Sequence, residues 1–284
     1  TYISFTFKSQ LLQMKIFKKK KDLIKEISKK KNIAFVPTMG SIHKGHLSLI
    51  TKAKKKSQNT LVSIYVNPKQ FNSDTDFKNY PRNIIKDIAL LKKIKVKYLY
   101  LPTYSDIYSF KPISPIYLDN FSKKLCGKFK PNHFEGVINI INRFVDIIKP
   151  RFIFLGHKDF QQLTLIKLHV SKNNINSKII SCPTIREKNG VALSSRNTKL
   201  SKNQIQIAAN IYSYLKDIKD KTIYNSFNKN KLKIIRKIIS LGVKKVEYLE
   251  YINIKTLKTI KKIDKNSNIF IAYYLGNIRM IDNL

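Results

Sequence analysis

Between residues 33 and 185 the chain alternates short runs rich in β-branched residues with longer runs that repeat at helical spacing. Parallel strands need a crossover segment between them, so this order is typical of a parallel sheet covered by helices. The pattern predicts strands at residues 33–36, 61–66, 96–101, 152–155 and 178–182. It predicts helices at residues 47–56, 84–93, 137–148 and 160–170. In such an α/β fold, ligands collect beyond the carboxyl ends of the strands.

The pattern changes after Ser194. A lysine-rich amphipathic helix is predicted from Ser201, a second helix at 229–239, and strands at 246–251 and 269–275. The polar segment 219–231 is predicted as a loop, with extension of a helix as the alternative. We therefore predict a Rossmann-like parallel-sheet nucleotide-binding domain at residues 14–184 and a smaller α+β domain at residues 185–284.

Composition limits the class of protein. The chain has 284 residues and is 43% apolar, which suffices for a sizeable core. Cys126 and Cys182 show no paired spacing, which fits a reducing cytoplasm. No stretch approaches the roughly 20 apolar residues of a membrane span, so we predict no membrane partner. Residues 1–13 lack a secretory pattern and are predicted to be an N-terminal extension before Met14, with organelle targeting as the alternative.

The formal charge of +39 would ordinarily indicate a nucleic-acid partner. However, only seven of the 56 basic residues are arginine, and the lysines are spread along the whole chain with isoleucine and asparagine. Nucleic-acid-reading surfaces favour the planar fork of arginine. We therefore predict no specific nucleic-acid partner and attribute the lysines to a coding bias toward A and T.

The segment 35–46 places two imidazoles behind a glycine turn, where an apolar strand passes into a helix. Backbone N–H groups are free at a helix start and attract anions. His43 and His46 share one face of the first helical turn, so both rings can reach the same phosphate group. The spacing indicates nucleotide chemistry, while two surface histidines beside a turn are the plain alternative.

Further polar blocks lie at residues 66–71, 80–82, 156–162, 183–186 and 193–197. Together with 35–46 and the segment 278–283, they resemble the pantothenate synthetase family in order and spacing, from about Met14 onward. The resemblance implies a cytoplasmic, homodimeric ligase that joins pantoate to β-alanine with ATP as co-substrate and Mg²⁺ carried on the ATP. The reaction passes through a pantoyl adenylate and releases AMP and pyrophosphate, in pantothenate and coenzyme A biosynthesis. Donors must then surround the triphosphate and stabilise the departing pyrophosphate.

The resemblance also assigns the ATP site. His46 is implied as the proton donor, His43 as a further phosphate contact, and Lys158 as the catalytic cation at the α-phosphate. His157 departs from the family, which usually has glutamate there. Ile185 is implied at the adenine, and residues 193–196 form a second phosphate-binding loop. The ATP-binding residues implied are Met39, Gly40, Ser41, Ile42, His43, Lys44, Gly45, His46, Gly156, His157, Lys158, Asp159, Ile185, Leu193, Ser194, Ser195 and Arg196.

The resemblance places Gln70 and Gln162 on pantoate, and Gln70 also on β-alanine. A glutamine offers a donor and an acceptor without adding charge, although exposed loop glutamines are common. Asp87 is implied as a partner of phosphate-bound magnesium, with a solvated helical acid as the alternative, and no resident metal site is predicted. Supporting pocket residues are implied at Asn67, Tyr80, Arg82 and His133.

Two other functions stay open at this point. A nucleotidyltransferase of the same superfamily would retain the nucleotide in its product and need no amine. A nucleic-acid-binding protein would explain the +39 charge and should bind in a salt-sensitive way, but the sequence contains no RNA-binding module or zinc pattern.

Overall fold

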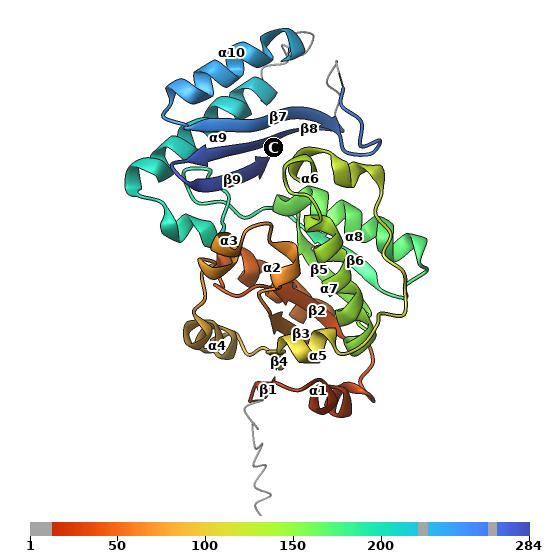
Figure 1. Ribbon diagram of the computed structural model, residues 1–284. Helices are drawn as coiled ribbons and strands as arrows, with labels where there is room; N and C mark the ends of the chain where they lie inside the picture. The colour runs from red at the N-terminus through yellow and green to blue at the C-terminus, as the bar shows by residue number, and fades with distance from the viewer. Residues whose placement is uncertain (1–12, 221–226, 261–265) are drawn as a thin grey trace, which may run out of the picture.

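The computed structural model describes residues 13–220, 227–260 and 266–284, which form two sheets (Figure 1). The larger sheet has six parallel strands in the order β1-β4-β3-β2-β5-β6. The smaller sheet has three antiparallel strands in the order β7-β8-β9. The strands are β1 (Lys15–Phe17), β2 (Ala34–Thr38), β3 (Thr60–Ile64), β4 (Tyr98–Tyr100), β5 (Phe152–Gly156), β6 (Lys178–Cys182), β7 (Lys245–Asn253), β8 (Ser267–Leu275) and β9 (Ile278–Asn283).

Helices connect the parallel strands and cover both faces of their sheet. The α-helices are α1 (Lys20–Ile27), α2 (Lys44–Lys56), α3 (Asp74–Lys78), α4 (Ile84–Lys93), α5 (Tyr104–Tyr108), α6 (Leu125–Phe129), α7 (His133–Ile148), α8 (Phe160–Lys172), α9 (Lys202–Asp220) and α10 (Phe227–Ser240). Short 3-10 turns are η1 (Pro68–Gln70), η2 (Asn120–Lys123), η3 (His157–Asp159) and η4 (Ser195–Lys199).

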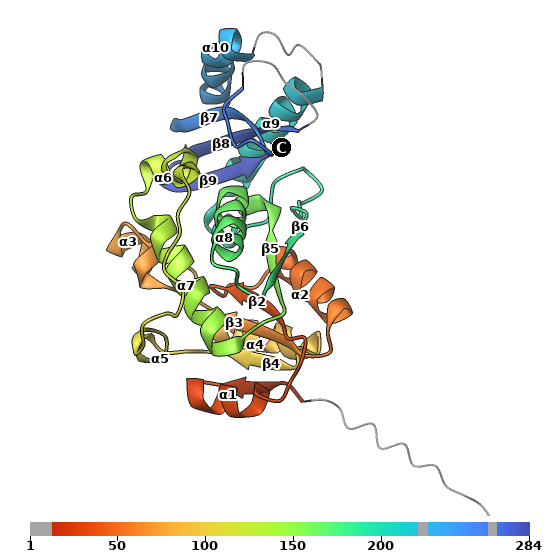
Figure 2. The ribbon, with the colours of Figure 1, turned by 90° about the vertical axis from the view of Figure 1, so that its right-hand side faces the viewer.

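Strand β2 shows why the larger sheet needs helices on both sides. Successive side chains of a strand point to opposite faces. Phe35 joins the core cluster built with α7 and α8, whereas Ala34 and Val36 join the cluster built with α2 and α4. All three side chains are fully buried, and Figure 2 shows α7 and α2 on opposite sides of the sheet. This two-sided burial is the reason the strands read as continuous apolar runs.

The smaller sheet packs its own apolar face against α9 and α10. Leu249 and Ile271 are fully buried there, together with Leu215 of α9 and Ile238 of α10. Phe270 lies on the other face of β8 and packs on Phe160 at the start of α8, with the ring centroids 5.3 Å apart. The two sheets therefore form separate cores that meet across an aromatic contact.

The predicted fold class is confirmed: a parallel sheet flanked by helices is followed by a smaller antiparallel sheet with two helices. All seven predicted strands are present, but β1, β9, α1 and the short helices α3, α5 and α6 were not predicted. β1 is only three residues long, and the polar residues of β9 hide its alternation. In the segment 219–231, α9 reaches Asp220 and α10 begins at Phe227, so the loop prediction was wrong at both ends; residues 221–226 lie outside the described part.

The boundary at residue 185 stays a prediction, and residues 1–12 of the predicted extension lie outside the described part. Within the described residues, no helix combines the length and the apolar character that a membrane crossing requires.

Candidate active site

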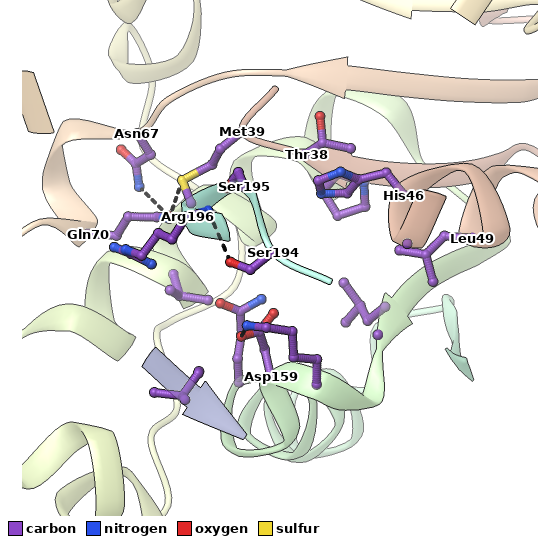
Figure 3. Close-up of a pocket in the computed structure, with 18 of the residues that line it drawn as sticks. Thr38, Met39, His46, Leu49, Asn67, Gln70, Asp159, Ser194, Ser195 and Arg196 are labelled. Atoms are coloured by element: carbon purple, nitrogen blue, oxygen red, sulfur yellow. Dashed lines mark hydrogen bonds and ion pairs between the residues drawn. The ribbon is translucent and has the colours of Figure 1, made fainter. Parts of the chain in front are cut away.

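A cavity of about 270 Å³ opens at the carboxyl ends of the parallel strands. Thr38 ends β2, Gly156 ends β5, Asn67 follows β3 and Pro183 follows β6, and all four line the cavity. Figure 3 shows His46, Gln70, Asp159 and Arg196 around it. Of the residues predicted to bind substrates, those that line the cavity are Met39, His43, Gly45, His46, Gln70, Gly156, Lys158, Asp159, Gln162, Ile185, Leu193, Ser194, Ser195 and Arg196.

The two imidazoles of the motif form the start of α2. The Nδ1 atom of His43 accepts a hydrogen bond from Gly45 N at 3.1 Å, and the Nδ1 atom of His46 accepts one from His43 N at 3.4 Å. The ring centroids are 4.1 Å apart. Because each Nδ1 is an acceptor, the proton of each neutral ring lies on Nε2. Both rings are therefore fixed as donors through Nε2.

Burial keeps these two rings neutral. It lowers the pKa of His43 to about 4, with a further lowering by the charge of Lys158. It lowers the pKa of His46 to about 3, with a further contribution from His43. At neutral pH each ring can donate an N–H to a phosphate oxygen without carrying a charge of its own. An arriving anion would favour protonation of both rings.

A buried carboxylate fixes the backbone of the glycine turn before α2. Gly40 has φ of +81°, and Ser41 also lies in the left-handed region with φ of +51°. The carboxylate of Asp87 accepts hydrogen bonds from Ser41 N and Ile42 N, both at 2.7 Å. The predicted role of Asp87 beside magnesium stays a prediction; its side chain is only 2% exposed and does not line the cavity. It fixes the turn that presents the histidines.

Five of the described residues predicted to bind ATP are absent from the cavity wall: Gly40, Ser41, Ile42, Lys44 and His157. The first three form the turn on Asp87, and Lys44 is exposed on the first turn of α2. The ring of His157 lies edge-on to Phe160, with the centroids 6.5 Å apart. Gly40, Ser41 and Ile42 therefore contribute to the site through the backbone of the turn rather than through the cavity wall.

The turn that carries Lys158 is tied to the smaller sheet. The Nδ2 atom of Asn283 on β9 donates to the carbonyls of His157 at 3.0 Å and Lys158 at 2.9 Å. The neighbouring Asp282 accepts two hydrogen bonds from Arg186, at 2.6 and 2.9 Å. The Nζ atom of Lys158 is 3.4 Å from the Asp159 carboxylate. Strand β9 therefore fixes the backbone from which this ammonium group reaches the cavity.

The two predicted glutamines lie on different elements of the cavity wall. The Oε1 atom of Gln70 accepts a bond from Asn67 Nδ2 at 3.3 Å, and its Nε2 donates to the sulfur of Met39 at 2.8 Å. The Nδ1 atom of His133 is 2.6 Å from the carbonyl of Gln70, so that nitrogen carries the ring proton. Asn67 is itself held by the Tyr108 hydroxyl at 2.8 Å. These contacts fix both the backbone and the amide of Gln70, while Gln162 lines the cavity from α8.

The second predicted phosphate loop approaches α3. The Tyr80 hydroxyl is 3.1 Å from Ser195 Oγ, and the Nη2 atom of Arg196 lies 3.2 Å from the Asp76 carboxylate. Tyr80 and Asn67 therefore belong to the pocket, as predicted. Arg82 does not line it and instead donates to the carbonyls of residues 77, 78 and 80.

Sequence reasoning missed four charged or thiol side chains of the wall: Asp76, Cys126, Lys130 and Arg279. Arg279 donates to Glu247 at 3.1 Å and to Cys126 Sγ at 3.5 Å. Burial and the charges of Arg279 and Arg196 lower the pKa of Lys130. The scarcity of arginine was the available signal, because Arg196 and Arg279 are two of only seven in the chain.

The site thus surrounds one cavity with neutral imidazole donors, two ammonium groups, guanidinium groups, neutral amides and two carboxylates. This set suits a polyanionic substrate together with a smaller polar one. With the parallel sheet and the glycine turn, it defines the class of nucleotide-binding α/β enzymes.

The family model for pantoate–β-alanine ligase matches residues 13–284. The chain therefore belongs to the pantoate–β-alanine ligase family, whose members are ATP-dependent ligases that form an amide bond. It is 36% identical over 267 residues to a pantothenate synthetase of Pseudothermotoga lettingae, covering 93% of this chain and 94% of that protein. It is 39% identical over 257 residues to one from a Sulfurihydrogenibium species, covering 89% and 92%.

Solved structures agree with these sequence matches. A pantoate–β-alanine ligase from Francisella tularensis, complexed with β,γ-ATP and β-alanine, has a TM-score of 0.81 and 37% identity, covering 95% of this chain and 97% of that one. A pantothenate synthetase from Thermus thermophilus has a TM-score of 0.83 and 26% identity, covering 95% and 99%. These matches favour the ligase over the nucleotidyltransferase and nucleic-acid-binding alternatives.

Proposed function

We propose that this cavity carries out both steps by which pantoate and β-alanine are joined at the cost of ATP. In the first step, a carboxylate oxygen of pantoate attacks the α-phosphorus, and the bond to the departing pyrophosphate breaks. In the second step, the amine of β-alanine attacks the acyl carbon, AMP leaves and the amine releases a proton. The observation that carries the proposal is the convergence of His43, His46, Lys158, Arg196 and the two glutamines on one cavity.

Each group has a role that follows from its chemistry. The Nε2–H groups of His43 and His46 donate to the triphosphate, and His46 stabilises the charge that develops as pyrophosphate leaves. The ammonium group of Lys158 holds the α-phosphate. Ser194, Ser195 and Arg196 bind the terminal phosphates.

The acid substrate is placed by neutral amides. Because the Oε1 atom of Gln70 is directed toward Asn67, its Nε2–H faces the opposite way, toward Met39 and the cavity. That donor suits a substrate oxygen, and Gln162 supplies a second amide from α8. The lining residues Val137, Ile140 and Phe144 of α7 offer an apolar surface for the carbon skeleton of pantoate.

Magnesium fits this site as an ion carried by the nucleotide. Among the described residues there is no group of three or more His, Cys, Asp or Glu side chains placed to hold a metal. The lining carboxylate of Asp159 can supply an oxygen, and the phosphates and water would supply the other ligands. When bound, the ion neutralises charge on the pyrophosphate.

Three further features belong to the proposal. The protein acts as a homodimer in the cytoplasm, and residues 185–284 act as a lid over the nucleotide. The dimer is carried over from the family resemblance alone, and the free thiols of Cys126 and Cys182 fit a reducing compartment. Light scattering tests the dimer.

The deciding experiment supplies purified protein with ATP, Mg²⁺, pantoate and labelled β-alanine. We expect labelled pantothenate and AMP in equal amounts, and pantoate-dependent ATP–pyrophosphate exchange when β-alanine is left out. A sample that forms neither AMP nor pantothenate would refute the proposal.

A further inference from the structure

The carboxylate of Asp76 faces the cations of the second phosphate loop. Its two oxygens lie 3.2 and 3.5 Å from the Nη2 atom of Arg196, and one lies 3.9 Å from the Nζ atom of Lys130. All three side chains line the cavity and are partly exposed, at 38% for Asp76, 32% for Arg196 and 22% for Lys130. The Asp76 carboxylate is therefore paired with the guanidinium group of Arg196, which the proposed function assigns to pyrophosphate.

The Asp76 carboxylate is not needed to join α3 to this loop. Two other contacts connect the same segments: the Tyr80 hydroxyl with Ser195 Oγ at 3.1 Å, and Lys199 Nζ with the Asn79 carbonyl at 2.6 Å. The first contact is between uncharged groups, and the second uses a backbone oxygen. Removal of the charge at position 76 should therefore leave the two segments in place.

A fixed carboxylate in a phosphate site has a predictable effect. It repels the terminal phosphates, and Arg196 must leave Asp76 before it can form two bonds to a phosphate group. The ion pair between Asp76 and Arg196 is partly exposed and therefore contributes little free energy, so Arg196 can exchange the carboxylate for a phosphate group at each turnover. Lys130 is adjacent to Asp76 and can remain its ion-pair partner when Arg196 moves to the phosphate.

We propose that Asp76 is an internal competitor for the pyrophosphate subsite. It pairs with Arg196 when no phosphate is bound, is displaced by the β- and γ-phosphates of ATP, and returns to Arg196 as pyrophosphate leaves. Asp76 thereby weakens the binding of pyrophosphate and speeds its release. This inference rests on the proposed function, because it takes the Arg196 loop as the site of the departing group.

The test uses Asp76→Asn, which keeps the size of the side chain and removes its charge. The matched control is Asp74→Asn, because Asp74 shares the first turn of α3 but is not among the lining residues. Magnesium pyrophosphate is the probe, measured by calorimetry on the protein alone and as a product inhibitor against ATP. We expect Asp76→Asn to lower the dissociation and inhibition constants by roughly two- to fivefold, the range available to a partly exposed ion pair. Asp74→Asn should change neither constant.

Salt gives a second measurement. The ratio between the wild-type and Asp76→Asn constants should shrink toward one as ionic strength rises, because the competing interaction is electrostatic. An Asp76→Asn constant that equals or exceeds the wild-type constant at low salt would overturn the proposal, and so would a ratio that salt does not change. Calorimetry needs no turnover, so failure here is distinguishable from failure of the wild-type protein to form pantothenate.

Discussion

Replacement of Asn283 by alanine should slow adenylate formation from a position outside the cavity wall. The side chain is 7% exposed and donates two hydrogen bonds, at 3.0 and 2.9 Å, to the backbone of the turn that carries Lys158. The matched control is Asn142→Ala on α7. Asn142 is 1% exposed and also has two side-chain contacts, with the Ser114 carbonyl at 2.7 Å and with His169 at 3.0 Å.

The expected magnitudes follow from these contacts. A net hydrogen bond contributes roughly 0.5–1.5 kcal/mol, so each variant should lose about 1–3 kcal/mol of unfolding free energy. Only Asn283→Ala releases the carbonyls of His157 and Lys158. A displacement of about 1 Å in a positioning element can cost on the order of 100-fold in rate. We therefore expect adenylation to fall by roughly 10- to 100-fold in Asn283→Ala and by less than about twofold in Asn142→Ala.

The assay is pantoate-dependent ATP–pyrophosphate exchange, measured well below both melting transitions, with urea unfolding to compare stability. Two results would refute the reasoning. One is an equal loss of exchange rate in both variants at equal stability, which would make the effect one of general destabilisation. The other is a normal exchange rate in Asn283→Ala despite the expected loss of stability.

Three further outcomes follow from the site. His46→Ala and Lys158→Ala should lower the adenylation rate at least about 100-fold, whereas Gln70→Ala should mainly raise the KM for pantoate and β-alanine; equal effects of all three on both parameters would contradict this division. Burial lowers the pKa of His133 and of His169 from the ordinary 6.5 to about 4. The unfolded chain therefore takes up protons before the folded protein does, and the free energy of unfolding should fall as the pH drops from 6.5 to 4. The slope is about 1.4 kcal/mol per pH unit for each proton taken up on unfolding, and a flat urea midpoint between pH 7 and pH 4.5 would argue against it. Excess chelator should abolish AMP formation yet leave the melting temperature unchanged, because no metal-ligating cluster occurs in the described part of the chain; a large loss in melting temperature would indicate a structural metal.

The sequence predicted the parallel sheet because its strands are buried on both faces and therefore appear as apolar runs. It could not predict β1, whose three residues are held in place by pairing with β4. It also missed β9, where Arg279 and Asp282 interrupt the apolar pattern and are satisfied by Glu247 and Arg186. Such strands depend on contacts with residues distant in the sequence, and the local pattern of apolar residues does not reveal those contacts.

The candidate site divides in a similar way. Motif spacing identified the residues that share one turn or one loop, such as His43 and His46. It could not separate the residues that line the cavity from those that form its supporting turn, where the Asp87 carboxylate accepts hydrogen bonds from the backbone N–H groups of Ser41 and Ile42. Nor could it identify Asp76, which enters the cavity wall only because α3 folds back toward the Arg196 loop. Which face a side chain presents depends on packing between elements.

The hydrogen bonding of His43 and His46 gives each ring two duties. The Nδ1 atom stabilises the beginning of α2, and Nε2 is left for the phosphate contact that we propose, so a single substitution would remove both. Asparagine reproduces the δ position of an imidazole and glutamine comes closer to its ε position. Comparing these two replacements at either histidine would separate the loss of activity caused by a missing hydrogen bond at the start of α2 from the loss caused by a missing donor in the cavity. An alanine substitution removes both groups at once and cannot distinguish the two effects.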